Sequence, residues 1–176
     1  GWPDLIRPII QSCQGASRLD WLSPLREDDF AEYRDSSFLE KLGLRHLTGA
    51  LPAFWPQRGP QWDGLARTDG GHVILVEAKA HLAEFCSPSS QASGHSLALI
   101  RDSLWNCARS MGVKDSHITS WGQHFYQYTN RLAHLHWLKQ NGIDARLVLV
   151  GFTGDTEMSG QVTRDAWEAA YMVADH

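Results

Sequence analysis

Two acidic residues and one lysine lie in a segment whose pattern predicts a β-hairpin. The turn signal Thr68-Asp69-Gly70-Gly71 separates two strand-like runs. In a hairpin centred on Gly70, Asp63 lies directly opposite Glu77, and Lys79 lies on the same face as Glu77. A shift of one residue in the turn would direct Asp63 to the opposite face. In the symmetric register, two carboxylates and one ammonium group meet at one end of the hairpin.

This set of side chains suits the binding of a divalent cation. Two adjacent carboxylates in a half-buried site repel each other unless a positive charge neutralises them. Their hard oxygen atoms match Mg²⁺ or Mn²⁺, and cross-strand neighbours about 5 Å apart can share one cation. Lys79 can orient or deprotonate a water molecule, or stabilise developing negative charge. Metal-assisted hydrolysis of a phosphodiester needs this combination of a cation, an activated water and a positive group.

The sequence Trp62-Asp63, followed by Glu77-Ala78-Lys79, resembles the signature of the PD-(D/E)XK nuclease superfamily, which has the restriction-endonuclease-like fold. In that family an Asp precedes a strand that carries Glu-x-Lys, and these residues bind metal and activate water. The resemblance implies that Asp63, Glu77 and the backbone carbonyl of Ala78 hold Mg²⁺ or Mn²⁺, with Lys79 as a catalytic residue. The chain departs from the signature at Trp62, which replaces the usual Pro. The family core is a mixed sheet in the order helix, three strands, helix, strand, and residues 25–155 resemble that order.

Two further site residues are implied by the resemblance alone. Many family members add an acidic residue from the first helix, for which Glu32 and Glu40 are the candidates. Glu40 also fits the third helical position of a capping box that starts at Ser37, so Glu32 is preferred. A glutamine from a helix after the hairpin also joins the site, and Gln127 is assigned to this role. Gln123 lies one turn earlier, and the family's Gln-x-x-x-Tyr pattern is not kept because Gln127 stands where Tyr would fall.

The remaining pattern predicts an α/β fold with a mixed central β-sheet flanked by helices on both faces, like the restriction-endonuclease-like core. The apolar run over residues 73–76 predicts a strand covered on both faces. Residues 1–24 are irregular in pattern and are expected to wrap the domain in short helical turns. The third strand of the family core is expected around residues 81–86 or as an extension of the hairpin. The expected elements are a helical segment at 25–44, either as one helix or as two with a break near Asp35–Ser37, hairpin strands at 61–67 and 72–80, helices at 96–111, 120–140 and 163–173, a strand at 146–152, and loops at 49–61 and 86–95.

Length and composition favour one domain. The 176 residues are expected to form a single domain over 1–176, with an N-terminal wrap over 1–24 and a nuclease-like core over 25–176. No apolar run reaches the roughly 18 residues of a membrane span, and no basic patch precedes an apolar stretch at the N-terminus. Neither a membrane partner nor a secretory signal is therefore expected. The three cysteines match no zinc or disulfide pattern, so the cytoplasm is the simplest compartment.

The net charge of −4 makes a nucleic-acid role depend on a local basic patch. The tryptophans at 105, 121 and 137 are expected in the core rather than as platforms for base stacking. Four basic residues are expected on the middle helices or the loop between them, as a solvated helix face or as phosphate contacts: Arg101, Arg109, Lys114 and Arg131.

These features predict a metal-dependent phosphodiesterase that acts on nucleic acid, with DNA as the expected partner. An alternative from a different class is a catalytically silent binding or scaffold module that keeps the nuclease-like fold, which the acidic net charge favours. A non-nucleolytic hydrolase is a third interpretation. The pattern leaves open whether DNA or RNA is cut, and whether cutting is endo or exo. No recognition domain is visible, so a homodimer or a partner protein could supply specificity.

Overall fold

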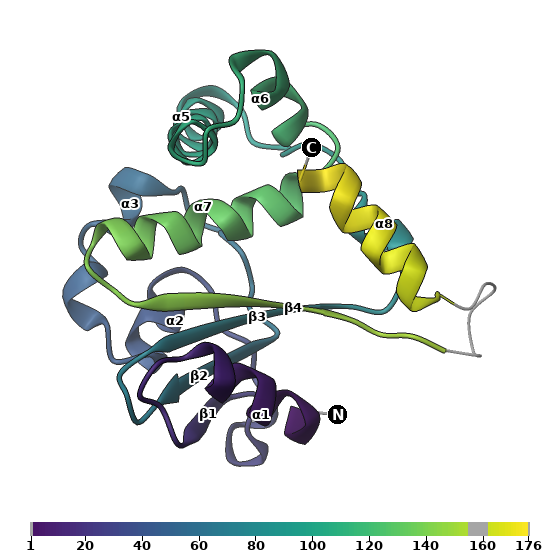
Figure 1. The fold of residues 1–176 in the computed structure, drawn as a ribbon. Helices are drawn as coiled ribbons and strands as arrows, with labels where there is room; N and C mark the ends of the chain where they lie inside the picture. The colour runs from purple at the N-terminus through teal and green to yellow at the C-terminus, as the bar shows by residue number, and fades with distance from the viewer. Residues whose placement is uncertain (1, 155–161, 176) are drawn as a thin grey trace. The chain divides into compact units, whose positions relative to one another are not determined.

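The computed structural model describes residues 2–154 and 162–175 and shows an α/β fold. A four-stranded mixed sheet in the order β1-β2-β3-β4 is flanked by helices, as the sequence predicts (Figure 1). The strands are β1 (Leu19–Ser23), β2 (Gly64–Thr68), β3 (Val73–Lys79) and β4 (Ala145–Gly151). The helices are α1 (Trp2–Ser12), α2 (Asp35–Lys41), α3 (Leu51–Phe54), α4 (Leu82–Phe85), α5 (Gly94–Ser110), α6 (Asp115–Trp121), α7 (Tyr126–Gln140) and α8 (Arg164–Asp175), with 3-10 turns η1 (Arg26–Asp28) and η2 (Arg45–Leu47).

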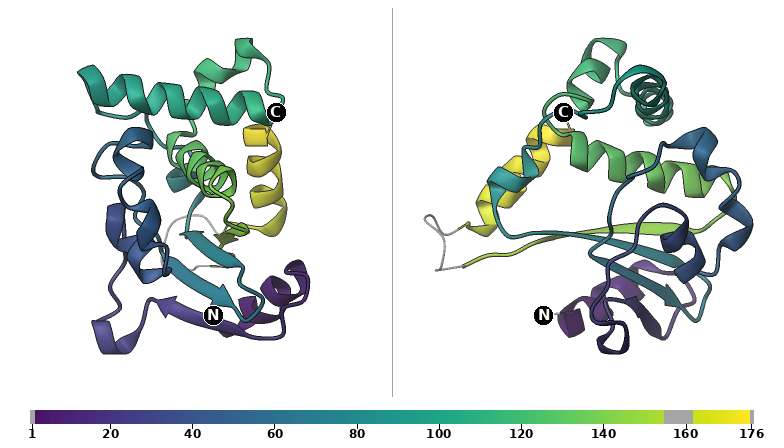
Figure 2. Two further views of the ribbon diagram at one scale, coloured as in Figure 1. Left: turned by 90° about the vertical axis from the view of Figure 1, so that its left-hand side faces the viewer. Right: turned by 180° about the vertical axis from the view of Figure 1, so that it is seen from behind.

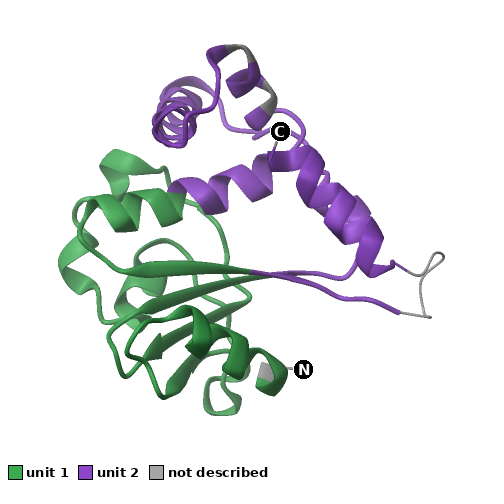
Figure 3. Cartoon of the chain, in the orientation of Figure 1, with its two compact units in different colours: residues 1–77, 134–148 green, residues 78–133, 149–176 purple. Residues whose placement is uncertain are grey.

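The chain forms two compact units, and each is described by itself (Figure 3). Unit 1 comprises Gly1–Glu77 and His134–Val148. Unit 2 comprises Ala78–Ala133 and Leu149–His176. Strands β3 and β4 and helix α7 each run from one unit into the other.

The strand directions make the sheet mixed. β1 pairs with β2 and β2 with β3, both antiparallel. Within unit 1 the amide of Val73 donates to the carbonyl of Asp144 at 2.9 Å, and within unit 2 the amide of Phe152 donates to the carbonyl of Lys79 at 3.0 Å. From the first hydrogen bond to the second, the residue numbers rise in both strands. β3 and β4 therefore run parallel.

The sheet gains its remaining strand, β1, from near the N-terminal end of the sequence, and two expectations are wrong as a result. Residues 1–24 are not irregular, because they form helix α1 and strand β1. The segment near residues 81–86 is not a strand, because Leu82–Phe85 is a short helix. The sequence did not reveal β1 because the strand is short and lacks the alternation that identifies a half-buried strand. Of its five residues, only Leu19 and Ser23, at the two ends, are buried.

The hairpin strands of unit 1 are covered on both faces, which confirms the prediction for residues 73–76. Ala66, Ile74 and Val76 have no exposed surface and lie on the strand face opposite that of Leu65, Val73 and Leu75. Helix α1 contacts β1 (Figure 2), and Ile9 of α1 and Cys13 just after it are buried. The face of Leu65, Val73 and Leu75 carries the main core, which includes the C-terminal half of α7. This core consists of Phe38, Leu39, Leu42, Leu44, Leu47, Leu51, Trp62, Leu65, Val73, Leu75, Trp137, Leu138 and Ala145.

Two of the predicted helices differ from the observed ones. The segment 25–44 holds only the turn η1 and helix α2, and Phe30, expected on a buried face, is 60% exposed. The capping box expected at Ser37 is absent from this segment, because α2 begins at Asp35 and the Ser37 hydroxyl donates to the carbonyl of Arg34. The helix expected at 120–140 is interrupted between Trp121 and Tyr126, where α6 ends and α7 begins.

Unit 2 is largely helical. Helix α5 buries Ile100, Leu104 and Cys107, and the loop over residues 86–93 precedes it, close to the loop predicted at 86–95. An aromatic cluster joins α4, α7 and α8, in which the Phe85 ring lies 5.4 Å from Tyr128 and 4.8 Å from Tyr171. None of the helices in the described part of the chain is long and apolar enough to cross a membrane.

Candidate active site

The turn between β2 and β3 is fixed by side chains on both of its flanks, all within unit 1. The Asp69 carboxylate accepts hydrogen bonds from the amides of Ser17 and Arg18 at 2.9 and 3.1 Å, and from the Ser17 hydroxyl. These donors, the Ser17 hydroxyl first, hold the pKa of Asp69 well below its usual range. Gly71 has φ +86°, a conformation that L side chains rarely adopt. The turn is therefore tied to the start of β1.

His72 anchors the same turn from its other side. Its amide donates to the Thr68 hydroxyl at 3.1 Å, and its Nδ1 lies 2.9 Å from the same oxygen. Its Nε2 lies 3.2 Å from an Asp144 carboxylate oxygen, just before β4. Because these contacts lock the turn to a neighbouring strand, a one-residue slip of the hairpin would break several hydrogen bonds at once.

The hairpin has the register predicted from its symmetry about Gly70. Gly64 pairs with Val76, Leu65 with Leu75, Ala66 with Ile74, and Arg67 with Val73. The observed pairs end there, and Asp63 lies in a bend just before β2; one further step of the same register would bring it opposite Glu77. The predicted register is therefore confirmed for residues 64–67 with 73–76, while the pairing of Asp63 with Glu77 and their metal-binding roles remain predictions.

Trp62 fixes the approach of the chain to Asp63. The Trp62 side chain has no exposed surface, and its ring centroid lies 5.9 Å from that of Phe38 and 6.1 Å from that of His134. Its amide donates to the carbonyl of Tyr33 at 3.1 Å. Trp62 therefore acts as an aromatic anchor for the position before the Asp63 carboxylate.

Glu77 lies at the end of a fully buried run. Val73 to Val76 are at most 1% exposed, and Glu77 is 5% exposed. Burial of a carboxylate is unfavourable unless its charge is compensated, so a buried acidic residue at a strand end is a candidate functional group. Lys79, the last residue of β3, is half-buried and shares the strand face of Glu77, whereas Ala78 between them points to the other face.

Glu32 is not on a helix, so its assignment as the acidic residue of the first helix is wrong, and the capping box for which Glu40 was set aside is not formed. It lies between η1 and α2, is exposed, and accepts a hydrogen bond from Gln61 Nε2 at 2.9 Å. An isolated antiparallel bridge pairs the next residue, Tyr33, with Trp62. The structure therefore brings the Glu32 segment beside the Asp63 segment. Glu40 is exposed on α2, 3.9 Å from a guanidinium nitrogen of Arg45.

Gln127 is the second residue of α7 and belongs to unit 2. Its amide donates to the Ser87 hydroxyl at 2.7 Å, and its side-chain Oε1 is buried without a hydrogen bond to the described residues. Gln123 lies in the link between α6 and α7, so the expected single helical face with Gln127 is not formed.

The tryptophans and arginines that the sequence pattern assigned to the middle helices differ in their burial. Trp121 and Trp137 are buried as expected, but Trp105 is 37% exposed, which corrects its assignment to the core. Arg131 is buried, and its guanidinium donates to Asn130 Oδ1 at 2.7 Å, so it is not part of a solvated face. Arg101 is exposed and lines a pocket in unit 2 that the sequence pattern did not indicate.

Within residues 2–154 and 162–175, no group of three or more His, Cys, Asp and Glu side chains is arranged to hold a metal ion. The metal-binding roles of Asp63, Glu77 and the Ala78 carbonyl therefore remain predictions. No protein-family model, curated protein or solved structure matches this chain.

Proposed function

We propose that this chain is a metal-dependent phosphodiesterase that hydrolyses nucleic acid, with DNA as its substrate. The observation that carries the proposal is the β2–β3 register, because its extension by one residue beyond Gly64 and Val76 would bring Asp63 opposite the buried Glu77, with Lys79 two residues further along β3. The element order adds support, because α1, β1, β2, β3, the crossover helices and β4 follow one another as the resemblance to the PD-(D/E)XK superfamily implies, with η1, α2, η2 and α3 as additional elements between β1 and β2.

The donor atoms fit Mg²⁺ or Mn²⁺. Both ions prefer oxygen ligands, and Mg²⁺ commonly binds through one or two carboxylates while it keeps several water ligands. Asp63 and Glu77 would supply the carboxylates, and the carbonyl of Ala78 a third oxygen. A site of this kind does not need three acidic side chains. When bound, the cation would polarise the phosphoryl oxygen and favour ionisation of a water molecule.

The chain's own residues would then position the reactants. Hydrolysis forms a bond from a water oxygen to phosphorus and breaks the bond from phosphorus to the leaving oxygen. The Lys79 ammonium would orient the attacking water, or stabilise the negative charge that develops on the phosphate oxygens. The network of hydrogen bonds at Asp69 and His72 would hold the hairpin in the register that aligns these groups.

Cleavage of supercoiled, linear and single-stranded DNA in Mg²⁺ or Mn²⁺ tests the proposal. Wild type should cut at least one substrate, and Lys79→Ala should lose at least tenfold of the rate because one positively charged group is removed. Lys139→Ala, which removes an exposed lysine near the end of α7, is the matched control and should cut like wild type. Unchanged cleavage by Asp63→Ala would reject the assignment of the site.

A catalytically silent binding module is the second candidate, favoured by the net charge of −4. Such a module need not bind a divalent cation, so calorimetric titration with Mn²⁺ distinguishes the two. Mn²⁺ binding that is lost in both Asp63→Asn and Glu77→Gln supports the phosphodiesterase.

A further inference from the structure

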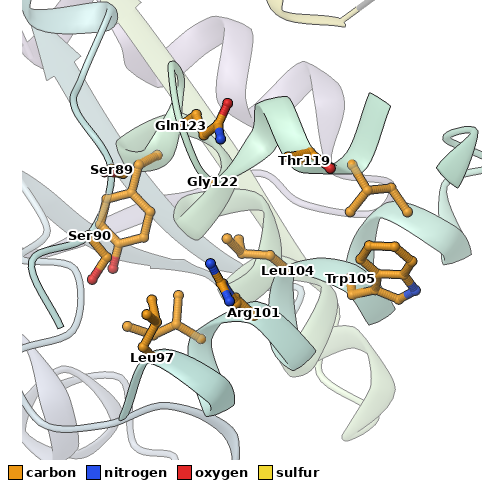
Figure 4. A pocket seen from close by; sticks show the side chains of 12 residues that line it. Ser89, Ser90, Leu97, Arg101, Leu104, Trp105, Thr119, Gly122 and Gln123 are labelled. Atoms are coloured by element: carbon orange, nitrogen blue, oxygen red, sulfur yellow. The ribbon is translucent and has the colours of Figure 1, made fainter. Parts of the chain in front are cut away.

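A pocket of about 500 Å³ lies wholly within unit 2 (Figure 4). It is formed by α5, α6, the link that follows α6, the first residue of α7 and the loop before α5. Its volume is within the range of about 300–1,000 Å³ that is typical of small-molecule sites. None of its lining residues belongs to the β2–β3 hairpin.

The pocket has an apolar floor. Leu97, Ile100 and Leu104 of α5 and Ile118 of α6 line it, and all except Leu97 are buried. Leu97, Ile100 and Leu104 are spaced as neighbours on one face of a helix. A ligand with a flat or apolar body would therefore be stabilised here by removal of its surface from water.

Arg101 is the charged residue of the pocket. Its guanidinium points among the other lining side chains (Figure 4), and no Asp or Glu lines the pocket. Arg101 makes no hydrogen bond or ion pair with the residues that the structure describes. Arg109 on the same helix differs, because its guanidinium pairs with Asp115 at 3.1 Å. The planar guanidinium of Arg101 is therefore available to a phosphate or carboxylate.

The rest of the lining supplies hydrogen-bonding groups and an aromatic ring. Ser90, Thr119, Gln123 and Tyr126 carry hydroxyl or amide groups. Trp105, one helical turn beyond Arg101, lines the pocket and is 37% exposed, with the guanidinium carbon of Arg109 5.2 Å from its ring centroid. A ligand that satisfies all of these groups has a planar ring, polar atoms on its edge and one negatively charged group.

We propose that this pocket binds one unstacked nucleotide unit, with its base against the apolar floor and Trp105 and its phosphate on Arg101. The choice of a nucleotide over other aromatic anions rests on the proposed action on nucleic acid. Base–aromatic stacking and Arg–phosphate contacts are the usual means by which proteins bind single strands. A free mononucleotide and one residue of a single strand both carry a base and a phosphate. The test therefore includes a probe for each of them.

The experiment is calorimetric titration in EDTA, which separates binding from cleavage. The probes are dAMP, deoxyadenosine, a six-residue oligodeoxyadenylate and 2-naphthoate. The proposal predicts binding of dAMP or the oligonucleotide, with deoxyadenosine at least about tenfold weaker because it lacks the phosphate. Tighter binding of the oligonucleotide assigns the site to single strands, and tighter binding of dAMP assigns it to free nucleotides.

Variants localise the binding to the pocket. Arg101→Gln and Trp105→Ala should each weaken binding about tenfold or more. Arg164→Gln, which removes an exposed arginine of α8 outside the pocket, is the matched control and should bind like wild type. Unchanged binding by Arg101→Gln, no binding of either nucleotide probe, or tighter binding of 2-naphthoate than of dAMP would overturn the proposal. Circular dichroism spectra of the variants confirm that they are folded.

The Asp63→Asn variant separates the two proposals, nucleotide binding in the pocket and phosphodiester hydrolysis at the hairpin. Nucleotide binding that persists in Asp63→Asn, together with no cleavage by wild type on any substrate, would reject the phosphodiesterase but keep the pocket. Metal-dependent cleavage by wild type, together with no nucleotide binding in the pocket, would reject the pocket alone.

Discussion

Replacing either hairpin carboxylate should remove a metal-dependent part of the protein's stability. Two unit charges about 5 Å apart, the spacing of cross-strand neighbours, repel by about 3 kcal/mol at an effective dielectric constant of about 20. A divalent cation relieves this repulsion only in the folded state, because the unfolded chain does not hold Asp63 opposite Glu77. Cation at 100 times its dissociation constant should stabilise wild type by about 2.7 kcal/mol. For a chain of 176 residues, this corresponds to a rise in Tm of about 5–11 °C.

Differential scanning calorimetry in EDTA and in saturating Mn²⁺ measures this effect. Asp63→Asn and Glu77→Gln should show little or no rise in Tm with Mn²⁺. In EDTA each should unfold close to or above the Tm of wild type, because the like-charge repulsion is gone. Glu40→Gln removes an exposed carboxylate of α2 in the same unit and should keep the full Mn²⁺ response. An equal Mn²⁺ response in wild type and in both hairpin variants would refute the reasoning.

Three further predictions concern the structure around the sites. A hydrogen bond from Lys41 at 2.6 Å and one from Tyr33 lower the pKa of Asp28, so its contribution to stability is present above about pH 4 and is lost as the pH falls through the lowered pKa. Urea unfolding should therefore show a larger loss for Asp28→Asn at pH 6 than at pH 3, and an equal loss at both would contradict this. A Cβ at Gly151 would lie 2.7 Å from the Trp167 ring, so Gly151→Ala should reduce the free energy of unfolding by about 1–3 kcal/mol in urea titrations, whereas Gly49→Ala, with open space around it, should not. Burial raises the pKa of Cys107 to about 12, so iodoacetamide at pH 8 should alkylate the exposed Cys86 and leave Cys107 unmodified in mass spectra of native protein.

The hairpin could be predicted from the sequence because its determinants are local. The Asp69-Gly70-Gly71 turn lies between two apolar runs, and the symmetric register about Gly70 follows from the turn alone. Strand β1 could not be placed in the same way, because its partner, β2, begins more than 40 residues later in the sequence. The pairing of distant segments depends on tertiary packing, which overrides weak local patterns.

Helix periodicity misplaced Glu32 for a related reason. Apolar residues near positions 30–38 follow a helical spacing, yet Phe30 and Asp29 have positive φ values, which end the turn η1. Tyr33 instead pairs with Trp62, so this segment is fixed by a long-range contact. Helix α1 is different, because Leu5, Ile6 and Ile9 have a helical spacing that could have identified it despite Pro3 and Pro8.

The pocket in unit 2 shows the limit of interpreting charges from sequence alone. Arg101 was an expected phosphate contact or a solvated residue, and α5 by itself allows both. The apolar residues near it on the helix, Leu97, Ile100 and Leu104, favoured the first interpretation, because an arginine among apolar positions is unusual on a solvated helix face. The cavity itself also requires α6 and the link to α7, whose break near Gly122 the sequence did not predict.

Glu77 distinguishes the two candidate functions on energetic grounds. A carboxylate that is 5% exposed must have its charge compensated to remain in a stable fold. In a silent module, other groups of the protein must compensate the Glu77 charge completely. Removal of metal by a chelator would then leave the free energy of unfolding unchanged. In a phosphodiesterase part of the compensation comes from the cation, so the stabilisation by added metal, the metal affinity and cleavage must all decline together when Asp63 or Glu77 is neutralised. Loss of only one of these three properties would show that the buried carboxylate is a structural residue.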